Sequence, residues 1–493
     1  MMDELSSHEL KNNYVWIWWC SITSTVLLAI FFSCYLFAVR NPHRGNDAAK
    51  KKIHVLPPFL PVGFFFILRN YSKQGPLLWR DLVEQYGHPV CCIKMLPKWL
   101  ALLLNRPSII VLITDPHMAR RYLQSPNCLK PVWLYKSQTV LLSKPGFSTS
   151  EGFRAMHVKK SLALAFQSKN TKYMLDIVMM HVRLWIKSRF LEVEGKGIDV
   201  GHELSRVMMK GMVEAMFRYR MSDEEIETFI LLHQTAWKFR KTSFAMVFRS
   251  FAPGYNGART AGKQIRKLVT RFIEKYRSGP LKVYNPTVID YLMRDTNYYS
   301  DEDRINDFVT ITGASYDTTA YTIVWAMIDL CHHPFEQDKL RKALHFAEPH
   351  ERSNIPELRN TIRESSRLHP VGGTGSFRTM DHEFFFEDFV VPKGELVMAS
   401  LFNLQRNEQV FENPLTFIPS RWSSMKEESN SSSIPFSLGR RSCPGIALAQ
   451  AVIRETITQL FEADVEYSLS CEGEISYQFT FHTVGTRFNS KRI

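Results

Sequence analysis

One cysteine stands in a setting that makes sulfur a strong ligand. Cys443 is followed by Pro444, Gly445 and an apolar-periodic run, IALAQAVIRETITQLFEA, that predicts a helix. A thiol at a helix N-terminus meets free N–H groups and the positive end of the helix dipole, which lower its pKa. Gly439 and Gly445 let backbone donors approach the sulfur closely. The pattern predicts a thiolate that binds a soft metal or haem iron, or a nucleophilic cysteine. A buried structural cysteine is the alternative.

A second chemically suggestive stretch falls in the middle of a long predicted helix. Ser300 can cap this helix, acidic residues fill its first turn, and no proline interrupts the pattern before Pro334. Its centre, GASYDTT over residues 313–319, consists of poor helix formers. A long helix that weakens at its centre favours a ligand or proton chemistry there. A simple local kink is the alternative.

The residues around Cys443 resemble a known signature. Phe436-x-x-Gly439-x-Arg441-x-Cys443-x-Gly445 is similar to the haem-binding motif of the cytochrome P-450 superfamily, the haem-thiolate monooxygenases. The membrane-anchored, microsomal type is the nearest in layout. Three further matches follow in the family's order: the stretch 314–319, the ExxR-like pair Glu364 and Arg367, and the segment 417–422 that contains Arg421. The resemblance covers about residues 55–493.

The resemblance implies haem b, iron protoporphyrin IX, as the cofactor. Cys443 would be the axial thiolate ligand of the iron, and Arg441 and Arg378 would pair with the haem propionates. Phe436 would cover the sulfur side of the haem. The full set implied to bind the cofactor is Lys159, Arg378, Phe436, Gly439, Arg441, Cys443 and Gly445.

Two further groups acquire roles from the resemblance. Glu364, Arg367 and Arg421 would form a buried charge network under the haem, which we interpret as structural. Asp317 and Thr318 match the family's acid–alcohol pair, which would deliver protons for oxygen activation.

The sequence departs from the family's pattern at two places. Ser315 occupies a position where the family usually has glycine, over the haem face. In the segment 151–166, the usual WxxxR becomes Ala155 and Lys159. One propionate contact would then be lost, or replaced by Lys159 or His157.

Composition limits the other classes of function. The chain has 493 residues, of which 62 are basic and 48 acidic, so its net charge of +14 favours an acidic partner or an anionic membrane surface. No compact motif of a nucleic-acid-binding module is visible, so we expect no nucleic-acid partner. Eight cysteines without a CxxC pair predict neither a disulfide framework nor a zinc knuckle.

The amino-terminal region predicts a membrane anchor. Residues 15–39 contain no charged residue and are long enough to span a bilayer once, although a cleaved signal peptide is the alternative. Basic residues follow this run, so residues 1–14 would be luminal and residues 63–493 would form a cytosolic catalytic domain. Residues 40–62 would be a basic, proline-rich linker. The endoplasmic reticulum is the compartment that the resemblance favours.

The predicted fold is mainly α with small β-sheets, the cytochrome P-450 fold, as one large haem-binding domain plus an N-terminal transmembrane helix. Residues 101–114 predict two short strands around a turn, and residues 170–280 predict mainly helices. No flavin or nicotinamide module is visible. NADPH–cytochrome P-450 reductase, with cytochrome b5 as a second candidate, would therefore supply electrons. It would dock on a basic group of Lys159, Lys160, Arg440 and Arg441, unless these are simply solvated.

The predicted activity is the insertion of one oxygen atom from O2 into a lipophilic small molecule such as a sterol, fatty acid or xenobiotic. The expected substrate-contacting regions, about 130–150, 205–255, 371–377 and 478–483, are apolar and aromatic. A haem-thiolate isomerase or desaturase without oxygen insertion is one alternative. A haem-binding membrane protein without turnover is another.

Overall fold

We analysed the fold in a computed structural model of the chain. The described residues are 53–55, 80–81, 90–94, 101–102, 105, 107–135, 140–190, 197–241, 253–279, 284–372, 376–386, 389–425, 432–461, 465–477 and 480–492.

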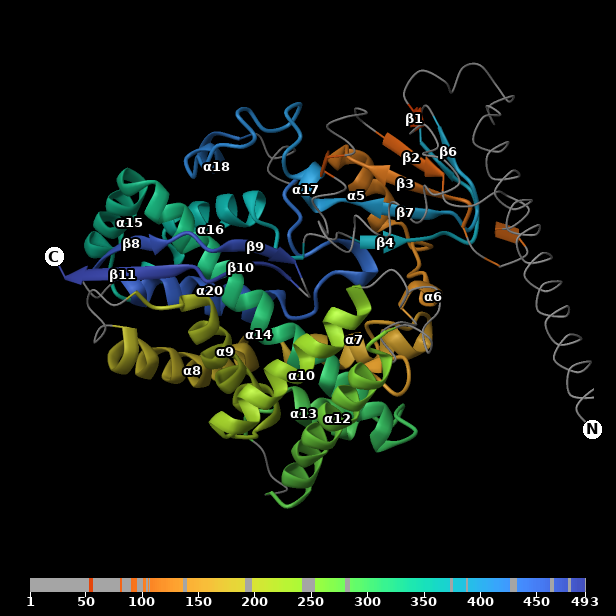
Figure 1. Ribbon diagram of the computed structural model, residues 1–493, viewed down its shortest axis with the longest axis horizontal. Coiled ribbons are helices and arrows are strands. Elements are labelled where there is room, and N and C mark those ends of the chain that lie inside the picture. The colour runs from red at the N-terminus through yellow and green to blue at the C-terminus, as the bar shows by residue number, and fades with distance from the viewer. Residues whose placement is uncertain are drawn as a thin grey trace, which may run out of the picture.

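A single long helix, α14 (Asp301–His332), runs through the centre of the molecule (Figure 1). The Ser300 side chain accepts a hydrogen bond from the Asp303 N–H, so the predicted cap and the predicted helix are both confirmed. Among the described helices, those that pack most extensively against α14 are α9 (Val200–Phe217), α12 (Tyr255–Arg277), α16 (Pro356–Leu368) and α20 (Ile446–Phe461).

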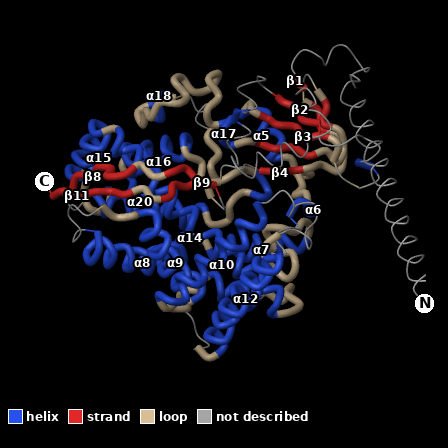
Figure 2. Tube along the Cα trace, in the orientation of Figure 1, coloured by secondary structure: helices blue, strands red, loops and turns tan. Residues whose placement is uncertain are grey.

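The remaining helices complete a mostly helical body (Figure 2). Residues 170–280 are mainly helical where they are described, as the sequence predicts. These elements are α5 (Pro116–Gln124), α6 (Val132–Tyr135), α7 (Phe153–Ala165), α8 (Ser168–Trp185), the π-helical turn η3 (Ile186–Phe190), α10 (Asp223–Lys241), α13 (Val288–Arg294), α15 (Pro334–Phe346), η5 (Arg352–Asn354), α17 (Leu401–Leu404), α18 (Arg421–Ser424) and η6 (Gly439–Arg441).

Apolar periodicity explains why these helices bury one face. On α12, Ile265, Val269 and Phe272 recur at intervals of three and four residues, and all three are buried. The helix also contains Gly262, where an added Cβ would lie 2.0 Å from the Val140 carbonyl oxygen. Glycine therefore lets α12 contact the backbone of the 140–150 loop, which leads into the functional site.

A mixed five-stranded sheet lies at one end of the molecule (Figure 1). Its strand order is β1-β2-β3-β7-β4, with the β1–β2 and β3–β7 pairs parallel and the other two antiparallel. The strands are β1 (Ile53–Val55), β2 (Val90–Lys94), β3 (Ile109–Ile113), β4 (Ser376–Arg378) and β7 (Leu396–Ala399).

Three two-stranded sheets complete the fold. They pair β5 (Phe384–Phe385) with β6 (Val390–Val391), β8 (Val465–Cys471) with β11 (Arg487–Arg492), and β9 (Glu474–Tyr477) with β10 (Phe481–Val484). The architecture is mainly α with small sheets, as the sequence predicts.

Three predictions have other outcomes. Residues 1–39, including the expected membrane anchor, lie outside the described part of the chain. No helix within that described part is long and apolar enough to cross a bilayer. Ile53–Val55, which the sequence analysis assigns to the linker, pairs with β2 at the edge of the sheet. In the 101–114 segment the second strand is confirmed as β3, whereas residues 101–102, expected to begin the first strand, are helical.

Candidate active site

The loop before Cys443 folds back on itself. The Cys443 N–H donates to the Phe436 carbonyl oxygen at 3.0 Å, and two residues between them, Ser437 and Gly439, have φ values of 60° and 72°. At Gly439 a Cβ would lie 2.1 Å from the Leu123 carbonyl oxygen of α5. Both the positive φ and this close approach require glycine. The loop is thus seated tightly on α5, and Cys443 follows just before helix α20.

The surroundings of the sulfur favour a metal ligand over a free nucleophile. Burial among protein atoms raises the pKa of the Cys443 thiol, while the Gly445 N–H and the Lys159 charge lower it. The interactions that the sequence predicts to lower the thiol pKa are therefore present, but desolvation outweighs them and the pKa is raised overall. Coordination to a metal cation removes the thiol proton outright. Because Cys443 keeps an accessible surface, a bound group can reach it.

Positive charge gathers near the loop. Arg378 on β4 is only 3% exposed; it donates to the Phe377 carbonyl oxygen at 2.8 Å and contacts the Cys128 thiol. No carboxylate of the described residues lies within ion-pair distance of Arg378. Desolvation, followed by the Arg441 charge, lowers the pKa of Lys159. A buried cation without an anion is unfavourable, so Arg378 fits a ligand that carries a carboxylate, as haem b does.

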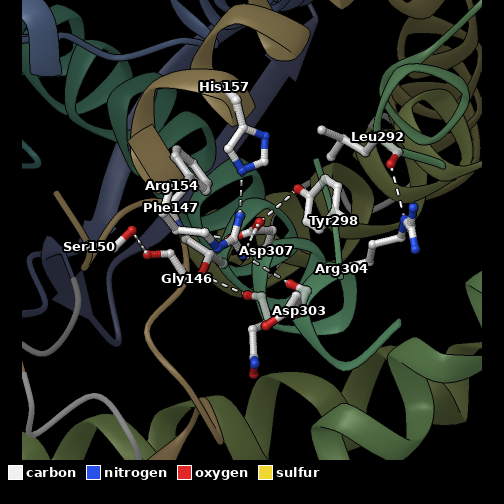
Figure 3. A network of polar contacts seen from close by, with 12 residues as sticks. Gly146, Phe147, Ser150, Arg154, His157, Leu292, Tyr298, Asp303, Arg304 and Asp307 are labelled. Atoms are coloured by element: carbon white, nitrogen blue, oxygen red, sulfur yellow. Dashed lines mark hydrogen bonds and ion pairs between the residues drawn. The ribbon is translucent and has the colours of Figure 1, made fainter. Parts of the chain in front are cut away.

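A buried aspartate, Asp307, anchors the loop that contains Phe147 (Figure 3), and this loop contacts Arg441. The Arg441 guanidinium donates to the Phe147 carbonyl oxygen at 2.7 Å, and the Phe147 N–H donates to Asp307 at 2.6 Å. Arg154 and Tyr298 both donate to the other carboxylate oxygen of Asp307, each at 2.7 Å. The network connects α7, α14 and the 140–150 loop, and it fixes the position of Arg441.

Sequence reasoning missed Asp307. It precedes Ala314 by seven residues and Thr318 by eleven, so helical periodicity places it on their face of α14. An acidic residue on the functional face of a central helix was the available signal. Nothing in the sequence indicated that its partner would be the backbone of Phe147.

The structure shows what the α7 residues that depart from the family's WxxxR pattern, Ala155 and Lys159, contact in this chain. Ala155 is fully buried, and His157 pairs through Nδ1 with Asp295 at 3.0 Å. His157 is therefore engaged with α13 and not with the cations of the cysteine loop. The Lys159 ammonium instead donates to the Arg440 carbonyl oxygen at 2.6 Å.

The predicted acid and alcohol on α14 are separated. The Thr318 hydroxyl donates to the Ala314 carbonyl oxygen at 2.8 Å, while Asp317 accepts from the Thr480 hydroxyl at 2.5 Å and lies near His482. They make no hydrogen bond to each other. Burial raises the pKa of Asp317, and Thr480 and His482 lower it. A carboxyl that holds its proton to higher pH suits a proton donor.

The centre of α14 remains helical despite its poor helix formers. The hydroxyls of Ser315 and Thr319 donate to the carbonyl oxygens of Thr312 and Ser315, at 3.0 and 2.9 Å. Such back-bonding satisfies these polar groups within the helix. Ala314 is nevertheless exposed, between the buried Gly313 and the half-buried Ser315, so this turn faces a space that no described side chain covers.

Glu364, Arg367 and Arg421 meet in the interior. Glu364 and Arg367 are 0% exposed and form a two-pronged ion pair at 2.8 and 3.0 Å. Arg421 Nε donates to the same carboxylate at 2.8 Å. Carbonyl oxygens satisfy the other guanidinium donors: those of Gln405, Glu412, Asn413, Pro414 and Thr416. The network joins α16 to the 412–421 segment.

The fold and the cysteine loop define a haem-thiolate protein, and comparison with known proteins agrees. The family model of Cytochrome P450 matches residues 57–470. The chain therefore belongs to the cytochrome P450 family, whose cofactor is haem b. This confirms the resemblance and the fold class inferred from the sequence.

Individual relatives are distant. Isoflavone 3'-hydroxylase of Medicago truncatula is 29% identical over 41% of this chain, an alignment that spans 42% of that protein. Cytochrome P450 508A1 of Dictyostelium discoideum is 24% identical over 81% of this chain and 85% of its own length. A crystal structure of a cytochrome P450 superposes with a TM-score of 0.68 at 16% identity, covering 87% of this chain and 99% of that one. That structure supports the fold alone.

Removing the shared carboxylate tests the buried network. Glu364→Ala leaves Arg367 and Arg421 buried without their counter-charge, so the free energy of unfolding should fall by about 3–5 kcal/mol. Thermal unfolding followed by circular dichroism measures the change. Glu357→Ala, in the first turn of the same helix, is the control and should cost less than about 1 kcal/mol. Equal stability of Glu364→Ala and wild type would contradict a structural role.

The raised pKa of Asp317 predicts a dependence of stability on pH. The folded protein binds this proton more tightly than the unfolded chain, whose aspartate titrates near 3.8. The tighter proton binding stabilises the folded state. This contribution is fully present below the unfolded pKa and is lost as pH rises through the higher folded pKa. Asp317→Asn should therefore gain thermal stability relative to wild type between about pH 4 and 8. Asp176→Asn, at an exposed site on α8, is the control. A constant difference across the series would refute the prediction.

Proposed function

We propose that this protein is a haem-thiolate monooxygenase that inserts one oxygen atom from O2 into a lipophilic small molecule. The observation that carries the proposal is the Cys443 loop: an accessible sulfur just before a helix N-terminus, with the buried Arg378 nearby, which has no carboxylate partner among the described residues. Cys443 would bind the iron, and Arg378 and Arg441 would hold the haem carboxylates. Phe436, half-buried at the start of the loop, would cover the sulfur side.

The reaction divides between the cofactor and the chain. Haem with a thiolate ligand supplies O2 binding and cleavage of the O–O bond. Overall, a C–H bond of the substrate becomes C–OH, and O2, two electrons and two protons yield this oxygen and one water. The chain must deliver those protons while excluding bulk water. Burial raises the pKa of Asp317, which suits a proton donor, and Thr318 offers a hydroxyl one residue further on.

The two alternatives remain outcomes of the tests. An isomerase that rearranges a peroxide would need no protons for O2 cleavage, and a protein without turnover would need none at all. A desaturase also reduces O2 and would need them. Asp317 and Thr318 therefore favour O2 activation, and product analysis separates hydroxylation from desaturation. The Ser315 hydroxyl donates within α14, to the Thr312 carbonyl oxygen.

The substrate class follows from the apolar regions named in the sequence analysis. Two relatives are named for oxidation of organic molecules: isoflavone 3'-hydroxylase, and 11-hydroxysugiol 20-monooxygenase of Salvia miltiorrhiza. These names support an organic substrate and hydroxylation chemistry. A sterol, fatty acid or xenobiotic is our proposal for this chain.

Electrons would come from NADPH through NADPH–cytochrome P-450 reductase, with cytochrome b5 as a second donor. Lys160 and Arg440 are exposed and would offer positive charge to an acidic partner. We further propose one transmembrane anchor at residues 15–39, with residues 1–14 luminal, residues 40–62 as the linker and residues 63–493 in the cytosol at the endoplasmic reticulum. The uncharged run and the basic residues after it support this arrangement.

A spectrum of the ligated haem tests the proposal. Reduced protein under carbon monoxide should give the strongly red-shifted Soret band of thiolate-ligated haem, and Cys443→Ala should abolish it, because the mutant lacks the donor sulfur. Cys471→Ala, at another exposed cysteine, is the control and should retain the band. Well-folded wild-type protein without haem would refute the proposal.

The amount of product formed per NADPH consumed tests whether Thr318 takes part in proton delivery. Thr318→Ala should lower product formed per NADPH by about 10- to 100-fold and raise hydrogen peroxide release, because a proton-carrying hydroxyl is lost. Thr322→Ala is the matched control, since its hydroxyl makes the same back-bond one turn later, to the Thr318 carbonyl oxygen at 2.8 Å. The measurement needs reconstituted reductase and a substrate that shifts the haem spin state. Equal coupling in both variants would remove Thr318 from the mechanism.

A further inference from the structure

The Lys159 ammonium is directed at the cysteine loop. Nζ lies 2.6 Å from the Arg440 carbonyl oxygen, 3.1 Å from the Ser442 hydroxyl oxygen and 3.5 Å from the Gly439 carbonyl oxygen. An ammonium group has three donors, and these three acceptors account for all of them. Every acceptor belongs to the four residues that precede Cys443.

We propose that Lys159 is a positioning residue for the Cys443 thiolate, which clamps the 439–442 segment and places a fixed positive charge beside the sulfur. In this assignment Lys159 does not bind a haem carboxylate. The inference rests on the proposed function, because it concerns the ligand of the same haem. It replaces the role that the family resemblance implies for this position.

The loop is held from two directions. On the α5 side, Gly439 packs against the Leu123 backbone, and Arg440 donates to the Pro126 carbonyl oxygen. Lys159 holds the loop from the α7 side. A ligand held on a short loop keeps its geometry only when the loop itself is fixed. A clamp on Arg440 and Ser442 acts within three residues of the sulfur.

The chemistry of lysine suits this task. Its ammonium is a compact charge with three donors, which can satisfy several carbonyl oxygens at once, whereas arginine has a planar fork that matches carboxylates. The buried Arg378 and the neighbouring Arg441 remain to bind the carboxylates of haem. Lys159 also interacts electrostatically with Cys443. Where the family has an arginine that pairs with a haem carboxylate, this chain has a lysine whose positive charge would instead lie at the cysteine loop.

Three variants of the full-length protein separate the effects of charge and of packing. Lys159→Met keeps the length of the side chain without charge or donors. Lys159→Arg keeps the charge. Lys160→Met is the control, because Lys160 is exposed on the same helix and has no hydrogen-bond or ion-pair partner among the described residues. The readouts are haem bound per protein, the carbon monoxide spectrum per haem, and the ferric/ferrous midpoint potential.

We expect Lys159→Met to raise the ratio of haem without the thiolate Soret band to haem with it by roughly tenfold, the effect of losing one hydrogen bond to a charged donor. Its midpoint potential should become more negative, because the added electron loses a neighbouring positive charge. Lys159→Arg should retain a potential close to that of wild type. Lys160→Met should match wild type in all three readouts.

Two results would overturn the inference. Lys159→Met with less bound haem, but an unchanged spectrum and potential per haem, would assign Lys159 to a haem carboxylate. Lys159→Met that matches wild type throughout would make it a solvated lysine. If Lys159→Met does not fold, as judged by circular dichroism, Ser442→Ala replaces it: this variant removes one of the three contacts and should give a smaller change in the same spectral ratio. A wild type without the thiolate band would instead refute the proposed function, and the inference with it.

Discussion

A negatively charged sulfur in a protein interior is stable only where hydrogen-bond donors and positive charge surround it. Much of the architecture serves this constraint at Cys443. Helix α20 begins just after it, the Gly445 N–H contacts the sulfur, and the tight loop on α5 fixes its position. The buried Arg378 has no carboxylate partner among the described residues, and a dicarboxylate cofactor such as haem b would supply one.

The charges in the core lie in separate networks that fix different elements. Glu364 joins two arginines and ties α16 to the 412–421 segment. Asp307 joins Arg154, Tyr298 and the Phe147 backbone, and so positions the loop that holds Arg441. In each network one carboxylate serves several donors, so the removal of one acid would disturb several elements at once. Rigid placement of the site thus depends on acids that would never touch the substrate.

Helix α14 combines stability with chemistry. Its hydroxyls bond back to the helix, which keeps a weak sequence helical across the core. Asp317 is held by Thr480 from the C-terminal hairpin and is separated from Thr318. Burial raises the pKa of this carboxyl, so its ionised form destabilises the folded protein. The same burial would suit a proton donor in a site that excludes bulk water.

Local sequence patterns determined the elements and the family. The cap at Ser300, the apolar period of α12 and the spacing of Phe436, Gly439 and Cys443 are short-range features, and short-range interactions decide them. Only the tertiary structure decided the partners. Asp317 contacts Thr480, 163 residues away, and Lys159 contacts the loop at 439–442. One sequence carries no record of which distant backbone groups a side chain will meet, because chain folding and packing bring them together.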